Sequence, residues 1–273
     1  MSQFPRFAIN RIMQPSLSLS DFIRLAADCR ASGVEIRNDL ADPSLLGGES
    51  PDHVRSVCRE NDLEVLTVNA LQRFNDPPLF PEKEEELNII MKTAAQVGCR
   101  MIVLCPVNDP DDNRGEAERH NDLVAALRRY VPLFEKHDMI GLVEPLGFEI
   151  CSVRTKGQAV KAIRESGLSD RYRIVHDTFH HFLSGEEKFF PAETGLIHAS
   201  GVHSGKPSAE ITDDDRLMVG DEDIMDNKGQ IKALYAGGFS GIMSFEPFSS
   251  EVQKLSPDQM REQVRQSMEY LFG

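Results

Sequence analysis

Residues 171–182 read RYRIVHDTFHHF, and the pattern in this stretch decides the fold of the whole chain. A short apolar run is typical of a strand that is buried on both faces. The run ends in a carboxylate, Asp177, and two imidazoles, His180 and His181, follow closely. Ionisable side chains at the end of a buried strand are either solvated loop residues or part of a site, and the rest of the chain must decide between these interpretations.

Similar runs recur along the chain, each after a polar or Gly-containing break. Each run is short and rich in Val, Ile, Leu or Phe, so each is predicted to be a buried strand. The eight runs are residues 6–13, 33–37, 63–69, 99–107, 140–146, 172–177, 195–202 and 240–248. No linker or low-complexity tract separates them, so we expect one domain over residues 1–273.

Helical patterns lie between the runs. In residues 18–33, serines placed to cap a helix precede apolar residues at i, i+3, i+4 and i+7 from Phe22, and Gly33 is expected to end the helix. Further helices are predicted within residues 82–98, 117–137, 152–167, 226–238 and 256–272. A short sixth helix is expected between His181 and Thr194.

Eight strands that alternate with helices over 273 residues match a single (β/α)8 TIM barrel in number and length. The alternative is an open, doubly wound sheet, which normally has a glycine-rich phosphate turn after its first strand. Residues 14–21 read QPSLSLSD at that point and contain no GxGxxG motif. The barrel is therefore the predicted fold.

Composition excludes several classes of protein. The formal net charge of −14 argues against general binding to a nucleic-acid backbone. No apolar stretch approaches the roughly 18–20 residues of a membrane span, and no basic segment followed by an apolar one marks a signal peptide. The five cysteines are odd in number and lack a CxxC pair, which is typical of reduced thiols in a cytoplasmic protein.

Ionisable residues mark four consecutive strands of the predicted barrel, whose carboxyl ends should form the active site. Glu144 ends the fifth strand, Asp177 the sixth and Glu246 the eighth, while His198 lies in the seventh. Three carboxylates within a few ångströms repel one another, and a divalent metal removes that conflict. The pattern predicts a metal site. Oxygen ligands with one imidazole favour Mn²⁺, and Zn²⁺, Co²⁺ and Mg²⁺ are alternatives.

Each of these residues has a simpler interpretation when it is taken alone. A lone Glu after a strand is usually a solvated loop residue or a helix cap, and a lone His in an apolar run is more often a core residue than a ligand. The metal hypothesis depends on all four occurring at successive strand ends. His203 is an alternative imidazole ligand, but His198 is preferred because it lies inside the apolar run.

Four motifs at these strand ends are similar to motifs of one family. They are VEPLGF (143–148), VHDTFHH (175–181), LIHASGV (196–202) and SFEPF (244–248). Through them the chain resembles, over nearly its whole length, the xylose isomerase-like TIM barrels, a group of sugar isomerases, epimerases and dehydratases. The resemblance implies that Glu144, Asp177, His198 and Glu246 are metal ligands, and that His180 contacts the substrate.

Three further stretches narrow the implied activity. Residues 177–185, 213–224 and 246–259 are similar to enzymes of this family that isomerise 2-keto-myo-inositol (inosose). The resemblance implies a small polyol or sugar substrate and an enediolate reaction in which Glu144 and Glu246 exchange protons with it. On the same scaffold, a ketose 3-epimerase, a hydroxypyruvate isomerase or an inosose dehydratase is an alternative. An abasic-site endonuclease relative and a non-enzymatic metal-binding barrel are less favoured.

Further substrate contacts are expected from His180, Arg216, Glu35 and Asn10, which lie at or near strand ends or in the loops that leave them. Arg216 could equally form an ion pair with one of the three aspartates before it. His180 could instead orient a metal ligand. A homodimer is compatible with such a barrel, although no residue pattern argues for it.

Overall fold

The computed structural model describes residues 4–41, 44–203 and 205–273, and these form a closed barrel of parallel strands. The strands are β1 (Phe7–Asn10), β2 (Gly33–Arg37), β3 (Glu64–Gln72), β4 (Met101–Cys105), β5 (Ile140–Val143), β6 (Tyr172–Asp177), β7 (Thr194–Ala199) and β8 (Ile242–Phe245). Each strand pairs with the next along the chain, and β8 pairs with β1. Each of the eight predicted runs overlaps one of these strands, and the predicted barrel is confirmed.

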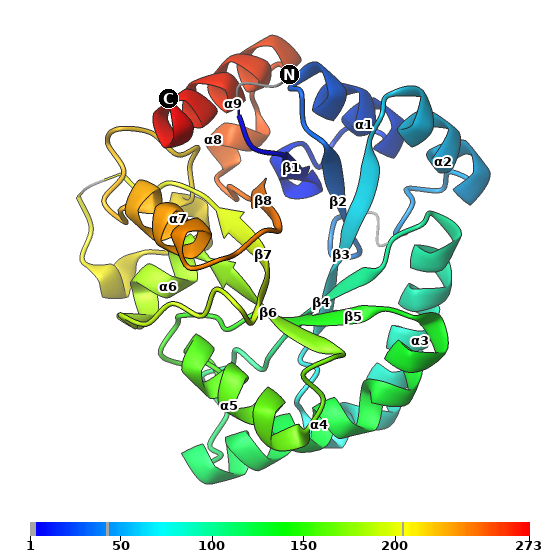
Figure 1. The fold of residues 1–273 in the computed structure, drawn as a ribbon, viewed down its shortest axis with the longest axis vertical. Coiled ribbons are helices and arrows are strands. Elements are labelled where there is room, and N and C mark those ends of the chain that lie inside the picture. The colour runs from blue at the N-terminus through cyan, green and yellow to red at the C-terminus, as the bar shows by residue number, and fades with distance from the viewer. Residues whose placement is uncertain (1–3, 42–43, 204) are drawn as a thin grey trace.

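Helices surround the barrel as an outer ring (Figure 1). They are α1 (Leu19–Asp28), α2 (Pro51–Glu60), α3 (Phe80–Gln96), α4 (Glu116–His137), α5 (Lys156–Ser166), α6 (Thr178–Ser184), α7 (Asn227–Ala236), α8 (Ser250–Gln253) and α9 (Pro257–Phe272). Short 3-10 turns are η1 (Arg11–Met13), η2 (Pro77–Leu79), η3 (Ser208–Glu210) and η4 (Asp213–Asp215). The last helix, α9, packs beside α1 and closes the ring.

Two helix predictions need correction. Helix α1 ends at Asp28, ahead of Gly33, because Arg30 adopts a left-handed backbone (φ 64°) that turns the chain into β2. Gly33 lies in β2 instead, where a Cβ atom would be 3.1 Å from the carbonyl oxygen of Glu64. The short sixth helix begins earlier than predicted, at Thr178, directly after the strand.

The barrel interior is layered. Ala8, Leu142, Val175 and Leu196 belong to a small apolar cluster. Because side chains alternate between the two faces of a strand, the inward residue two positions further along each of these strands lies nearer the carboxyl end. Those positions carry polar side chains, namely Asn10, Glu144, Asp177 and His198. The apolar layer thus forms the floor beneath a polar layer at the mouth.

The remaining core lies between the barrel and the helices, where most large apolar side chains are buried. All five cysteines are buried and free, as the reduced-thiol prediction requires. Within the described ranges, no helix is long and apolar enough to cross a membrane.

Candidate metal centre and active site

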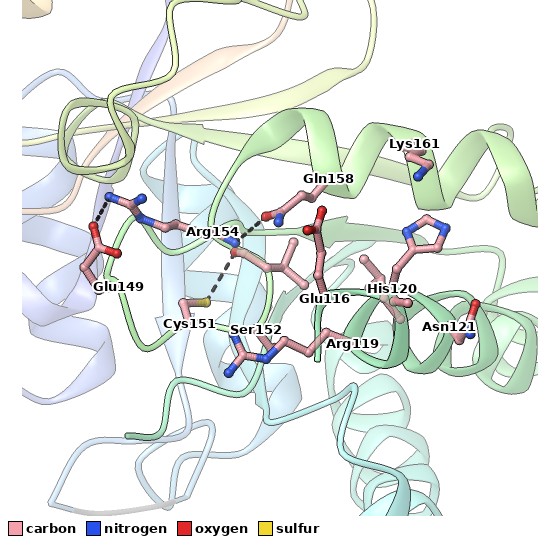
Figure 2. Close-up of a pocket in the computed structure, with 13 residues that line it drawn as sticks. Glu116, Arg119, His120, Asn121, Glu149, Cys151, Ser152, Arg154, Gln158 and Lys161 are labelled. Atoms are coloured by element: carbon pink, nitrogen blue, oxygen red, sulfur yellow. Dashed lines mark hydrogen bonds and ion pairs between the residues drawn. The ribbon is translucent and has the colours of Figure 1, made fainter. Parts of the chain in front are cut away.

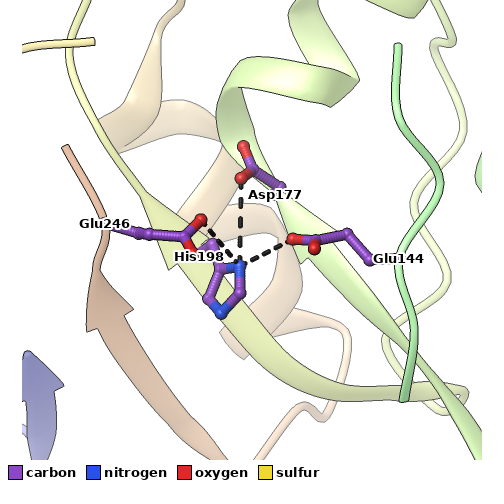
Figure 3. A group of neighbouring side chains, drawn as sticks. All are labelled: Glu144, Asp177, His198 and Glu246. Carbon is purple, nitrogen blue, oxygen red and sulfur yellow. Dashed lines mark hydrogen bonds and ion pairs between the residues drawn. The ribbon is translucent and has the colours of Figure 1, made fainter. Parts of the chain in front are cut away.

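Strand register brings the predicted ligands together. In the β6–β7 pair, Asp177 lies opposite His198. Glu144 and Glu246 come directly after β5 and β8, and their backbone N–H groups bond to Leu104 and Ala199 on the neighbouring strands. One ligand atom from each of the four side chains lies within 4.8 Å of all the others, and all four residues are buried. Figure 3 shows the three carboxylates converging on His198.

The two nitrogens of His198 have separate partners. Nδ1 lies 2.7 Å from Glu144 Oε1, 3.1 Å from Glu246 Oε2 and 3.9 Å from Asp177 Oδ2. Nε2 lies 3.1 Å from Glu35 Oε2. Nδ1 therefore faces the carboxylate cluster, while Glu35 supports the imidazole from behind, an arrangement that commonly orients metal-binding histidines.

The charges of the cluster fit a divalent cation. Burial alone would lower the pKa of His198, but the charges of Glu246, Glu35 and Glu144 outweigh it and raise that pKa well above its usual value. Burial alone would raise the pKa of Glu246, but His198, Arg216 and Arg37 hold it well below its usual range. The carboxylate of Glu246 thus favours its charged form beside these positive groups. Three carboxylate oxygens and one imidazole nitrogen are a suitable donor set for such a metal.

The alternative ligand His203 lies outside this group. Its side chain is 39% exposed, and Nδ1 lies 3.3 Å from Glu222 Oε2. His181 also lies elsewhere, with Nδ1 against the ammonium group of Lys156. Burial and then the positive charge of Lys156 lower the pKa of His181 to about 3, so this imidazole is neutral.

Asp177 has two structural roles at the end of β6. One oxygen, Oδ2, lies in the ligand cluster, while Oδ1 accepts hydrogen bonds from the backbone N–H groups of Phe179 (2.7 Å) and His180 (3.2 Å). Asp177 is therefore the N-cap of α6. His180 lies in the first turn of that helix rather than in the expected loop. Its Nδ1 is buried and has no hydrogen-bond partner among the described residues.

Arg216 reaches the cluster from the loop after β7. Its Nη2 donates to Asp177 Oδ2 (2.7 Å) and Glu246 Oε2 (3.0 Å), and Nη1 pairs with Asp213 at 3.3 Å. The guanidinium lies 4.6 Å from the ring centroid of Phe248. Arg216 thus forms the ion pair with a preceding aspartate, and its guanidinium also lies beside the carboxylates of two predicted ligands.

Arg37, which sequence reasoning missed, is a second buried arginine at the cluster. Its Nη1 donates to Glu246 Oε1 at 2.8 Å, and Nε and Nη2 each donate to Asp39 at 2.7 Å. The side chain of Arg37 is 5% exposed. Its position at the end of β2 was the available signal, because strand ends in a barrel face the mouth.

Glu35 and Asn10, both expected near the substrate, lie beneath the mouth and are fully buried. Asn10 Nδ2 donates to Glu246 Oε1 at 3.0 Å, and Glu35 Oε2 accepts from Asn69 at 2.9 Å in addition to its contact with His198. The described lining of the cavity at the mouth includes neither residue. In this structure the two side chains contact the candidate ligands His198 and Glu246, and their contact with a substrate stays a prediction.

That cavity has a volume of about 430 Å³, which is within the usual range for small-molecule sites. Its lining combines charged, polar and aromatic groups. The residues most relevant to the site are Arg37, Glu144, His180, Arg216, Glu246 and Phe248. The same cavity is therefore lined by two candidate ligands, Glu144 and Glu246, and by two expected substrate contacts, His180 and Arg216.

Comparison with known proteins identifies the family. The model of the xylose isomerase-like TIM barrel family matches residues 23–272. The chain belongs to this family. The inosose isomerase of Bacillus velezensis is 25% identical over 243 residues, which are 86% of this chain and 85% of that protein.

Solved structures agree with this membership of the xylose isomerase-like family. A xylose isomerase domain-containing protein from Salmonella typhimurium LT2 has a TM-score of 0.91 and 34% identity, covering 100% of this chain and 99% of that chain. The IolI protein with a bound zinc atom has a TM-score of 0.89 and 21% identity, covering 98% of each chain.

This xylose isomerase-like barrel has a second cavity of about 670 Å³, lined by residues of α4, α5 and the segment before α5 (Figure 2). Several of its charged side chains are paired. Arg154 lies 2.6 Å from Glu149, and His120 lies 2.8 Å from Glu165. Two members of the candidate ligand group, Glu144 and Glu246, line the other cavity, so we assign the candidate active site to the barrel mouth.

Proposed function

We propose that the chain is a divalent-metal-dependent isomerase that acts on a neutral polyol ketone, with 2-keto-myo-inositol as its substrate. The observation that carries the proposal is the buried group of Glu144, Asp177, His198 and Glu246 beside the mouth cavity. The inosose isomerase that is 25% identical to the chain supports this substrate. The zinc in the similar IolI structure supports a metal.

These four residues would hold the metal ion. Mn²⁺ is favoured by the hard carboxylate ligands, and Zn²⁺, Co²⁺ and Mg²⁺ are alternatives. Such an ion supplies Lewis-acid stabilisation of the negative charge that develops on substrate oxygens.

The chain's own residues would move the protons. Isomerisation removes the proton from the carbon beside the ketone, gives an enediolate and returns a proton to the former carbonyl carbon. Glu144 and Glu246 are the candidate proton carriers because both line the cavity. His180 and Arg216 line it as well and would hydrogen-bond to substrate oxygens.

The charges of the cavity favour an uncharged substrate. Three arginines, Arg37, Arg73 and Arg216, line it, and each already pairs with carboxylates of the chain. An anionic substrate would therefore find no unpaired arginine among them. This favours a polyol ketone over hydroxypyruvate, while ketose 3-epimerisation and inosose dehydration remain alternatives because their substrates are also neutral.

A test is proton NMR of 2-keto-myo-inositol in D2O with the purified protein and Mn²⁺, repeated with a chelator. We expect metal-dependent loss of an α-proton signal together with new ketone resonances. Exchange without new resonances would indicate a related enzyme with another natural substrate. No exchange with any of the four metals would overturn the assignment to inosose.

A further inference from the structure

The three ligand carboxylates differ in what holds their second oxygen. In each, one oxygen lies near His198 Nδ1, namely Glu144 Oε1, Asp177 Oδ2 and Glu246 Oε2. The remaining oxygen is the one that could accept a proton from the substrate. That of Asp177 is occupied, because it caps α6 by accepting two backbone N–H groups.

The second oxygen of Glu246 is occupied as well. Glu246 Oε1 accepts from Arg37 Nη1 at 2.8 Å and from Asn10 Nδ2 at 3.0 Å. Both donors are themselves fixed. Arg37 is held by Asp39, and Asn10 Oδ1 accepts from Arg37 Nη1 (3.2 Å) and from the backbone N–H of Ile12 (3.1 Å). A carboxylate oxygen with two such donors is poorly placed to take a proton from carbon.

The second oxygen of Glu144 differs from both. Its neighbour is the thiol of Cys105, with Sγ at 3.5 Å from Oε2, and a thiol is a weak donor. Among the described residues, no N–H group donates to this oxygen. Glu144 and Cys105 both line the mouth cavity, so this carboxylate lies beside the space available to a substrate.

We propose that Glu144 alone carries the migrating proton, and that Arg37 and Asn10 hold Glu246 as a fixed ligand that does not exchange protons with carbon. This inference rests on the proposed function. Glu144 Oε2 takes the proton from the carbinol carbon as that C–H bond breaks, and its electron pair forms the enediolate double bond. Glu144 then returns the proton to the former carbonyl carbon, while the hydroxyl proton passes from one oxygen to the other. One carbon is oxidised and its neighbour is reduced, so no other reactant is needed.

The test follows α-proton exchange in D2O by NMR, starting separately from 2-keto-myo-inositol and from its isomeric ketone product. The wild type is compared with Glu144→Gln and Glu246→Gln, each loaded with Mn²⁺ to the saturation measured by calorimetry. We expect Glu144→Gln to slow exchange from both ketones by at least about 100-fold. Glu246→Gln should bind Mn²⁺ more weakly, and the loss of exchange that remains at saturation should be smaller than in Glu144→Gln and the same for both ketones.

Two proton carriers would give a different pattern, in which each variant loses exchange from only one of the two ketones. That pattern would overturn the inference while leaving the proposed isomerase intact. A wild type that exchanges neither ketone would overturn both. Glu64→Gln, which changes a half-exposed carboxylate paired with Arg6, is the matched control and should exchange as the wild type does.

A second measurement covers the case in which a variant does not fold. The Mn²⁺-loaded wild type is incubated with a cyclohexane polyol epoxide, and modified peptides are identified by mass spectrometry. The attacking carboxylate oxygen opens the epoxide and forms an ester, and the released alkoxide takes up a proton. We expect the ester on Glu144. An ester on Glu246 would show that its oxygen is accessible and would contradict the inference.

Discussion

His198 Nε2 lies 3.1 Å from Glu35 Oε2, and both side chains are completely buried. Their contact orients the imidazole so that Nδ1 faces Glu144 and Glu246. Glu35 also accepts hydrogen bonds from Thr67 and Asn69, so its own position is fixed. An outer carboxylate of this kind contributes to metal affinity without touching the metal.

Replacing Glu35 with Gln should therefore weaken Mn²⁺ binding by about 10–100-fold, the usual effect of losing such a partner. Isothermal titration calorimetry of the metal-free protein measures this directly. Glu64→Gln, at the exposed start of β3, should leave the affinity unchanged. Equal affinities for both variants would show that Glu35 does not orient the ligand.

Metal binding should stabilise the fold, and more strongly as pH rises. The raised pKa of His198 means that, without metal, its protonation stabilises the folded state below the unfolded pKa of about 6.5. That contribution is lost as pH rises through the higher folded pKa. A metal competes with the proton on His198, so its binding is favoured by higher pH.

The measurement is the melting temperature with Mn²⁺ and with a chelator, between about pH 6 and pH 8. At a metal concentration of 100 Kd the added stability should reach about 2.7 kcal/mol. The metal-dependent increase in melting temperature should grow with pH and disappear in His198→Asn. An increase that shrinks as pH rises would contradict this account.

Arg216→Ala should strongly destabilise the metal-free protein. The guanidinium is 1% exposed and pairs with two buried carboxylates, so its removal leaves their charges uncompensated. The expected loss in unfolding free energy is about 3–5 kcal/mol, measured by urea denaturation. Arg265→Ala, which removes an exposed arginine paired with Glu262 and Glu269, should change stability very little. Similar losses in both variants would argue against the buried pairs as the cause.

Gly147→Ala should disturb the site through backbone packing. A Cβ atom at this position would collide with the carbonyl oxygen of His180 and lie 2.9 Å from the backbone nitrogen of Ser184. Helix α6 would have to shift, so we expect a lower melting temperature and a higher KM for the ketone. Gly220→Ala, where a Cβ meets nothing within 4 Å, is the control. An unchanged KM in Gly147→Ala would show that α6 tolerates the shift.

The strands could be predicted because each is a local apolar run, and the barrel follows from their number and alternation with helices. The convergence of Glu144, Asp177, His198 and Glu246 was predictable for a related reason. Side chains at the carboxyl ends of strands in a barrel face one mouth, so the position of a residue along its strand predicts where its side chain lies in the barrel.

The pairing of Arg37 with Glu246 could not be predicted in the same way. This bond joins residues 209 positions apart and depends on the closure of the barrel between β1 and β8. Glu35 was noticed, but its partner His198 also lies across the barrel interior, so sequence alone did not separate substrate contact from support of a ligand. Helix α6 starts earlier than the sequence predicts because Asp177 is both a candidate ligand and the N-cap of the helix, a position where Asp is preferred.

Asp177 is both the N-cap of α6 and a member of the candidate ligand group, and the two roles together restrict which residues this position can accept. Asn could still cap α6 but would lose the anionic oxygen that faces the cluster. Glu would keep the charge, but its extra methylene would move the carboxylate away from the backbone of Phe179 and His180. A metal ion at this site and the first turn of α6 would thus depend on the same side chain. Binding of the ion should therefore stabilise the first turn of the helix that carries His180. We expect the metal to bind before the substrate.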